Sequence, residues 1–108
     1  MLTSAEIRSA IPLAFDEVSL PGLTAERGQV RDNYALADGR RIAISTDRFT
    51  IFDQRVGLVP YQGQLLNQLT AWWFEQTADI TPNHAIDIPD PNVTIALSAD
   101  PLPIAVIV

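Results

Sequence analysis

The 108-residue chain contains no cysteine. Without a thiol it can form neither a disulfide nor a thiolate nucleophile, and Cys-ligated zinc is excluded as well. The composition fits a reducing compartment, so we expect a cytoplasmic protein. Histidine occurs once, at His84, which argues against a zinc site built by this chain alone. We expect His84 to cap or hydrogen-bond the backbone; a general base is the alternative.

Positive charge is also scarce. Seven Lys and Arg residues stand against 13 Asp and Glu residues, which gives a net charge of −6. A nucleic-acid backbone and an anionic membrane surface are therefore poor partners, and any bound phosphate must be held by a local basic pocket. No apolar run approaches the ~20 residues that span a bilayer. The N-terminal residues show no basic start followed by an apolar run, so no secretory signal is predicted.

The remaining composition is that of an ordinary globular protein, with 47% hydrophobic residues and room for one small domain. Thr3 and Glu6 have the spacing of a capping box. This spacing predicts a short helix to about Ala10, which Pro12 ends. Phe15–Leu20 is expected to be a short extended piece.

The stretch from Arg27 to Asp53 organises the chain. Two strands are predicted there, the second from Arg41 to Thr46, with Asp38 and Gly39 forming the hairpin turn between them. Along the first strand, alternation places Val30, Asp32, Tyr34 and Leu36 on one face and Arg31, Asn33 and Ala35 on the other.

The loops that flank this hairpin carry the candidate site. Gly28 opens the first strand, Arg31 and Asp32 lie just inside it, and Arg48 follows in the loop that faces them. This arrangement is typical of a site for a phosphorylated anion. The pattern Gly-x-x-Arg-Asp is a weak signal by itself, and a hairpin with surface charges is the alternative.

The clearest helix is predicted over Gln64–Ala78, after a short strand at Val56–Val59 that Pro60 ends. Its apolar residues recur at helical spacing, which marks it as amphipathic. They are Leu65, Leu69, Trp72 and Trp73, with Leu66 and Phe74 widening the stripe. We expect this stripe to be part of the core and not a cofactor site.

Two more strands are predicted at Val93–Leu97 and Ile104–Val108, after a proline-rich connection over Asp87–Asn92. The last strand, IAVIV, has the pattern of a central strand buried on both faces. Such a strand is an aggregation liability at an open edge. We therefore expect that something continues or covers it, or that copies of the chain associate through it. Together these elements predict an α+β fold, a small antiparallel sheet with one long amphipathic helix.

Four segments occur in the order and spacing of one known family: GQVRDNYAL, STDRFTIFD, VPYQGQLLNQLTAWWFEQTADITPNH and DPLPIAVIV. The ordered set resembles the start of SAICAR synthetase (phosphoribosylaminoimidazole-succinocarboxamide synthase). The resemblance runs from about Phe15 to Val108 and covers only the N-terminal part of the family's usual length. It implies the first lobe of a two-lobe fold similar to kinase and ATP-grasp lobes. Residues 1–108 would form a single N-terminal unit, with about 1–100 in that lobe and 103–108 as the first strand of a second.

The resemblance also implies a function. The family is a magnesium-dependent ligase of de novo purine synthesis that joins L-aspartate to carboxyaminoimidazole ribonucleotide, with ATP giving ADP and phosphate. The expected route activates the carboxylate as an acyl phosphate. The 108-residue chain alone is expected to have little or no activity. A degenerate, non-catalytic module that binds a nucleotide or a protein is the alternative.

Site residues follow from the same resemblance. The implied ATP-binding residues are Gly28, Gln29, Val30 and Arg31, with Gln29 in place of the family's Lys. The implied ribonucleotide-binding residues are Asp47, Arg48, Thr50 and Asp53. No catalytic residue or metal ligand is assigned within the chain, and magnesium ligands are expected from the family's C-terminal half. Ala105 stands where the family has a Glu by the nucleotide pocket. Arg48→Ala is expected to weaken ribonucleotide use and leave the fold intact.

Overall fold

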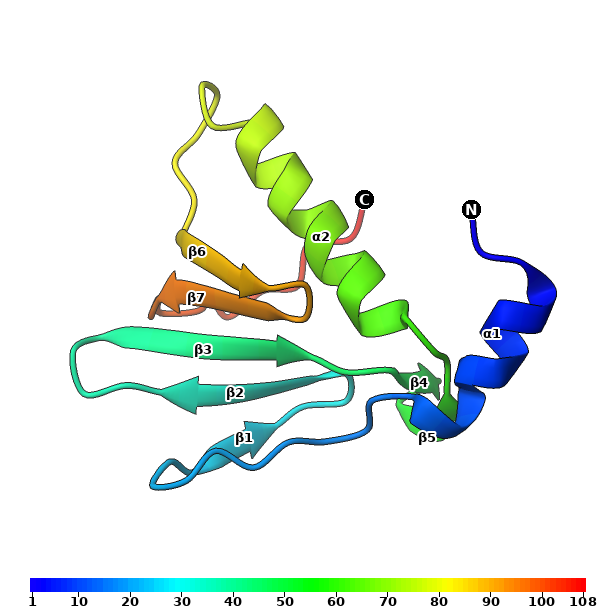
Figure 1. Ribbon diagram of the computed structural model, residues 1–108. Coiled ribbons are helices and arrows are strands. Elements are labelled where there is room, and N and C mark those ends of the chain that lie inside the picture. The colour runs from blue at the N-terminus through cyan, green and yellow to red at the C-terminus, as the bar shows by residue number, and fades with distance from the viewer.

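A computed structural model describes residues 1–108 as one antiparallel sheet with a helix across it, a separate hairpin and a short N-terminal helix (Figure 1). The elements are α1 (Ser4–Ala10), a 3-10 turn η1 (Ile11–Leu13), β1 (Ala25–Arg27), β2 (Arg31–Ala35), β3 (Arg40–Ser45), β4 (Arg48–Ile51), β5 (Gln54–Leu58), α2 (Gln62–Gln76), β6 (Ala85–Asp90) and β7 (Val93–Leu97). The five-stranded sheet has the order β1-β2-β3-β7-β6, and β4 pairs with β5 alone. The predicted α+β class is confirmed.

The β2–β3 hairpin forms as its alternation predicts. Asp32 pairs with Ile44 and Tyr34 with Ile42 in an antiparallel register. Gly39 adopts a φ of 81° at the turn, where a residue with a Cβ would be strained. Tyr34 is 1% exposed and donates a hydrogen bond from its hydroxyl to the carbonyl of Val18, at 2.7 Å. This bond ties the segment before β1 to the sheet.

Helix α2 crosses one face of the sheet and contacts β3, β6 and β7 (Figure 1). Gly63 lets the helix approach closely, because a Cβ there would lie 2.5 Å from the carbonyl oxygen of Ser45. Asn67 is buried, accepts a hydrogen bond from the Thr94 hydroxyl at 2.7 Å and donates one to the Pro91 carbonyl at 3.1 Å. Helix α2 thus packs on the sheet through a close backbone contact at Gly63 and the hydrogen bonds of the buried Asn67.

The prediction that the apolar stripe of this helix is core is wrong. Trp72 is 48% and Trp73 53% exposed, and their rings contact each other edge to face with centroids 4.8 Å apart. The buried positions of α2 are Gly63 and Asn67 instead. The sheet face below the helix carries small and polar side chains such as Ala43 and Thr94. The side of α2 that can approach this face closely therefore packs on it, and the bulky side faces outward.

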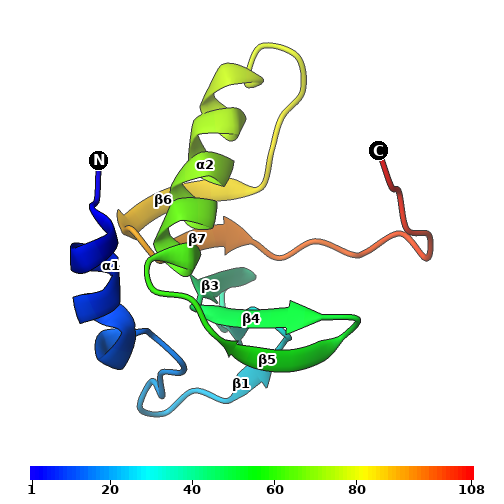
Figure 2. The same cartoon turned by 90° about the vertical axis from the view of Figure 1, so that its right-hand side faces the viewer.

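The strands differ from prediction in several places, and β1 was not predicted at all. Arg48–Ile51, expected as loop, is β4, and the expected proline-rich connection begins inside β6. The predicted strand Ile104–Val108 is absent, and in Figure 2 this segment extends away from the sheet. A strand requires an edge to pair with, and no strand of this chain runs beside it. Its apolar side chains are accordingly exposed.

His84 lies just before β6. Its ring contacts the ring of Phe74 in a T-shaped arrangement, with centroids 5.6 Å apart. Its backbone carbonyl accepts a hydrogen bond from the amide of Leu97 at 2.8 Å. These contacts join the end of α2 to the β6–β7 edge, so the residue has a packing role. Neither α1 nor α2 combines the length and the apolarity that crossing a lipid bilayer would require.

The N-terminal capping box is confirmed and predicts an acid-sensitive helix end. The Thr3 amide donates to the Glu6 carboxylate at 2.6 Å, and the Glu6 amide donates to the Thr3 hydroxyl at 3.2 Å. The backbone hydrogen bond from Thr3 lowers the pKa of Glu6 below its ordinary value.

Because the pKa of Glu6 is lower in the folded state, its contribution to stability is complete above the unfolded-state pKa. That contribution is lost as pH falls through the folded-state pKa. We expect the Thr3 amide resonance to titrate with that low pKa in NMR spectra recorded from pH 6 downward. Glu6→Gln keeps an acceptor without a titrating group, so a Thr3 resonance that titrates equally in this variant would contradict the assignment.

Candidate functional site

The candidate site is built around the loop 28–30, which joins β1 to β2 at the end of the sheet where β3 leaves for β4 (Figure 1). The loop is tight, because the Gly28 amide donates to the carbonyl of Arg31 at 2.7 Å. A Cβ at Gly28 would lie 3.0 Å from that carbonyl oxygen. The close approach of the backbone to itself therefore favours glycine at this position.

A pocket of about 340 Å³ opens beside this loop. Its walls come from the loop, from β2 and the end of β3, and from one side chain of α2. The lining residues are Gly28, Gln29, Val30, Arg31, Asn33, Ser45, Thr46 and Leu66. All four residues that the family resemblance implies for ATP thus lie around one cavity. That they bind ATP stays a prediction.

Arg31 supplies the positive charge of this pocket. The chain has no lysine, and five of its seven arginines form ion pairs with carboxylates: Arg27, Arg40, Arg41, Arg48 and Arg55. Arg31 forms none; its Nε donates to the Ser45 hydroxyl at 3.3 Å. Arg31 is exposed and lines the pocket. The other N–H groups of its guanidinium can therefore donate hydrogen bonds to an anion there.

Arg48 is arranged differently from Arg31, because its side chain is buried with 6% of the residue exposed. Its guanidinium donates four hydrogen bonds: to the carbonyls of Asp16 at 2.7 Å, Gln29 at 3.2 Å and Gly28 at 3.1 Å, and to Oδ1 of Asp32 at 2.6 Å. Asp32 is fully buried and also accepts from Arg27 at 3.0 Å. Arg48 therefore joins the loop, β2 and the N-terminal segment.

Asp47 is turned inward as well. Its Oδ1 accepts from the amide of Gly63 at 2.8 Å and its Oδ2 from the amide of Phe15 at 2.9 Å. Helix α2 begins after Tyr61, which has a φ of 66° and makes no side-chain capping bond. Asp47 thus replaces the missing local cap, with its negative charge at the positive end of the helix dipole.

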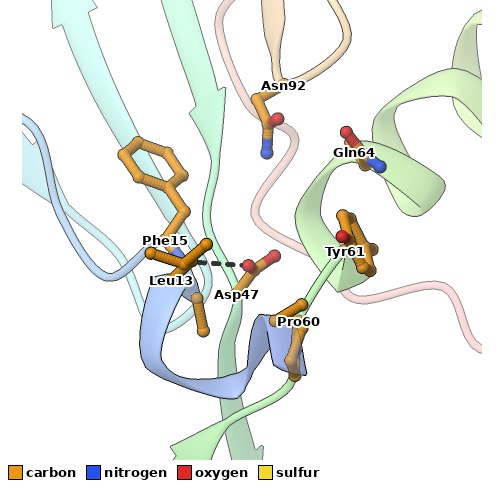
Figure 3. A pocket seen from close by; sticks show the side chains of 9 residues that line it. Leu13, Phe15, Asp47, Pro60, Tyr61, Gln64 and Asn92 are labelled. Atoms are coloured by element: carbon orange, nitrogen blue, oxygen red, sulfur yellow. Dashed lines mark hydrogen bonds between the residues drawn. The ribbon is translucent and has the colours of Figure 1, made fainter. Parts of the chain in front are cut away.

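Figure 3 shows Asp47 at the wall of a second cavity, of about 260 Å³, between the end of α1 and the start of α2. The side chains around it are mostly apolar, including Leu13, Phe15 and Pro60. Both carboxylate oxygens of Asp47 already accept hydrogen bonds from backbone amides. We assign this cavity no ligand.

The β4–β5 turn brings together two of the predicted site residues. Asp53 has a φ of 62° in this turn, and its Oδ1 accepts a hydrogen bond from Nε2 of Gln29 at 3.0 Å. Gln29 of the loop 28–30 thus contacts the segment that the family resemblance implies for the ribonucleotide. Thr50 lies on β4 behind the turn and is partly buried. The geometry gives Asp47 and Arg48 positioning roles, and direct contact of these four residues with a substrate stays a prediction.

Sequence reasoning missed part of the pocket lining. Asn33 and Ser45 lie on the face of the sheet that Arg31 occupies, so the alternation of β2 and β3 could have identified them. Leu66 enters from α2, and nothing in the sequence indicates which helix residue reaches this loop.

The acidic residues here do not fit a magnesium site. Asp32 is paired with two arginines, Asp47 with two backbone amides, and Asp53 with Gln29. No three Asp, Glu or His side chains of the chain converge as a metal-binding group. We therefore derive no step through magnesium from these residues.

Comparison with known proteins identifies the family. The family model described as SAICAR synthetase matches residues 24–108. The chain belongs to the SAICAR synthetase family. A relative from Agrobacterium fabrum is 53% identical over 94 residues, which are 86% of this chain and 30% of the relative. The phosphoribosylaminoimidazole-succinocarboxamide synthase of Legionella pneumophila (strain Paris) is 45% identical over 98 residues, covering 91% of this chain and 31% of that one.

The fold comparison agrees with this family assignment. The structure titled SAICAR-synthase from Saccharomyces cerevisiae complexed SAICAR aligns with a TM-score of 0.71 at 24% identity. It covers 79% of this chain and 37% of the yeast chain. At that identity the match supports the fold alone, which is the fold predicted from the resemblance. The chain spans about a third of the length of the SAICAR synthetases it matches.

Proposed function

We propose that this chain is the ATP-binding lobe of a ligase that joins L-aspartate to carboxyaminoimidazole ribonucleotide and forms SAICAR, ADP and phosphate. Family membership supports the reaction. The observation that carries the assignment of this lobe is the pocket beside the loop 28–30, where a glycine turn and the unpaired Arg31 meet. We further propose a cytoplasmic location.

The reaction depends mainly on positioning of the reactants and neutralisation of the phosphate charges. The terminal phosphoryl group of ATP passes to a carboxylate oxygen of the ribonucleotide and ADP leaves. The amine of aspartate then attacks the acyl carbon, phosphate departs with its electron pair, and the amine loses a proton as the amide forms. Magnesium, when bound, would help neutralise the phosphates, with ligands from outside this chain. Here the loop 28–30 and Arg31 hold the phosphates, and the neighbouring β4–β5 turn faces the ribonucleotide.

A non-catalytic nucleotide- or protein-binding module is the second candidate. It is favoured by Gln29, which brings no charge to a loop where the family has a Lys. The two candidates differ in their requirement for the second substrate. ADP formation that depends on both aspartate and the ribonucleotide belongs only to the ligase, and we expect the 108-residue chain by itself to lack it.

ATP binding by the lobe is tested with the 108-residue chain in an NMR titration of its backbone amides. We expect ATP to shift the resonances of Gly28, Val30 and Arg31. Arg31→Gln should weaken binding by about 1.5–3 kcal/mol, the usual worth of a hydrogen bond to a charged group. Arg40→Gln is the control, because Arg40 is exposed and paired with Asp38 in the β2–β3 turn. A wild-type chain that shows no shift with ATP would exclude the nucleotide site and leave a protein-binding role.

A further inference from the structure

Three consecutive carbonyls of the loop accept hydrogen bonds from two buried residues. Arg48 binds the carbonyls of Gly28 and Gln29. Thr46 binds the carbonyl of Val30 through its amide at 2.9 Å and its hydroxyl at 2.6 Å. Arg48 is 6% exposed, so the side of the loop that it occupies is the interior, and Thr46 is fully buried at the wall of the pocket.

The direction of the carbonyls fixes the direction of the amides. A trans peptide is planar, and its C=O and N–H point in opposite directions. The N–H of Gln29 shares a plane with the carbonyl of Gly28, and the N–H of Val30 shares one with the carbonyl of Gln29. Both amides therefore point away from Arg48. Neither donates a hydrogen bond anywhere in the protein.

We propose that Arg48 is a positioning residue that turns the amides of Gln29 and Val30 outward as an anion-binding nest for the phosphates of the nucleotide. The nucleotide's identity rests on the proposed function; the nest itself rests on the geometry. Outward amides of successive residues form the concave anion sites found in other phosphate loops. The loop lines the pocket and Arg48 does not, which fits a role exerted through the backbone. The buried carboxylate of Asp32 fixes the guanidinium at 2.6 Å from the opposite side.

Arg48→Lys tests the proposal, because lysine keeps the charge but lacks the planar set of donors that reaches two carbonyls and Asp32 together. The control is Arg55→Lys, since Arg55 contacts the Asp16 carboxylate from an exposed position and not the loop. Each chain is titrated with ATP and with inorganic tripolyphosphate while the amide resonances are followed. We expect Arg48→Lys to weaken both ligands roughly tenfold or more, a change of about 1.4 kcal/mol or more. Arg55→Lys should bind as the wild type does.

The outcomes separate the two proposals. Equal binding by wild type and Arg48→Lys overturns the positioning role and leaves the ATP site standing. If the wild type binds neither ligand, the proposed function fails, and the positioning role is decided in the free protein. There, scalar couplings of Gln29 and Val30 that change in Arg48→Lys support it, and unchanged couplings overturn it.

One measurement needs no variant, which covers the case in which Arg48→Lys fails to fold. In the wild-type chain, hydrogen exchange should be fast at the Gln29 and Val30 amides and slow at the amides of Thr46 and Asp47. The latter two donate to the carbonyls of Val30 and Phe15. Protection of the two loop amides equal to that of Thr46 would overturn the proposal.

Discussion

Arg48→Ala is expected to lower the free energy of unfolding by about 3–5 kcal/mol, the usual cost of removing one partner from a buried ion pair. The truncation removes all four hydrogen bonds of the guanidinium. It leaves the fully buried Asp32 with only Arg27 as an ionic partner, and the Arg27 side chain is 42% exposed. Urea denaturation followed by tryptophan fluorescence measures the change.

Arg55→Ala is the matched control. Arg55 also reaches the N-terminal segment, through the Asp16 carboxylate at 2.7 Å, but both side chains are substantially exposed. Its loss should cost about 0–1 kcal/mol, as surface ion pairs do. If the two variants are equally stable, Arg48 does not hold the loop, β2 and the N-terminal segment together. The sequence alone suggested that Arg48→Ala would leave the fold intact, and burial of the guanidinium reverses that prediction.

Gly63→Ala is expected to destabilise the fold although alanine is the better helix former. Its new Cβ would lie 2.5 Å from the carbonyl oxygen of Ser45 and 2.7 Å from that of Thr46. Both atoms belong to the backbone, so relief requires α2 to move off the sheet and to weaken the hydrogen bond that the Gly63 amide donates to Asp47. Overpacking of this kind costs about 1–3 kcal/mol. The free energy of unfolding from urea titration tests this expectation.

Gly57→Ala provides the comparison. No atom outside its chain neighbours lies within 4 Å of a Cβ built at Gly57, and its φ is outside the left-handed region. Alanine there should leave stability unchanged or raise it by up to about 1 kcal/mol, because it removes freedom from the unfolded chain. A Gly63→Ala variant as stable as Gly57→Ala would mean that the helix can shift without cost.

The sequence predicted those elements whose formation depends on residues close together in the chain. The β2–β3 hairpin followed from alternation and from Asp38 and Gly39 at its turn, and the α1 cap followed from Thr3 and Glu6. The extent of α2 was predicted within two residues at each end. Its orientation was not, because that depends on Gly63 and Asn67 meeting a small, polar sheet face. A hydrophobic pattern contains no information about such a partner.

The candidate site likewise has a part that depends on contiguous residues and a part that depends on distant ones. The family motif located the pocket-lining loop from Gly28 to Arg31, since those residues are contiguous. The inward direction of Arg48 depends on a carbonyl 32 residues away, at Asp16. Two prolines, Pro89 and Pro91, concealed β6, because proline argues against a strand. β6 tolerates Pro89 since it lies at the edge of the sheet, where not every amide needs a partner.

The polar contact between α2 and the sheet affects the heat-capacity change on unfolding. Only four apolar residues are buried in the structure: Ala10, Tyr34, Ile44 and Ala96. Exposure of apolar area on unfolding raises the heat capacity, whereas exposure of polar groups such as Asn67 and Asp32 lowers it. The heat-capacity increment of this chain should therefore be small for its length. A small increment broadens the stability curve, so the geometry of the loop 28–30 would be maintained with little change over a wide range of temperature.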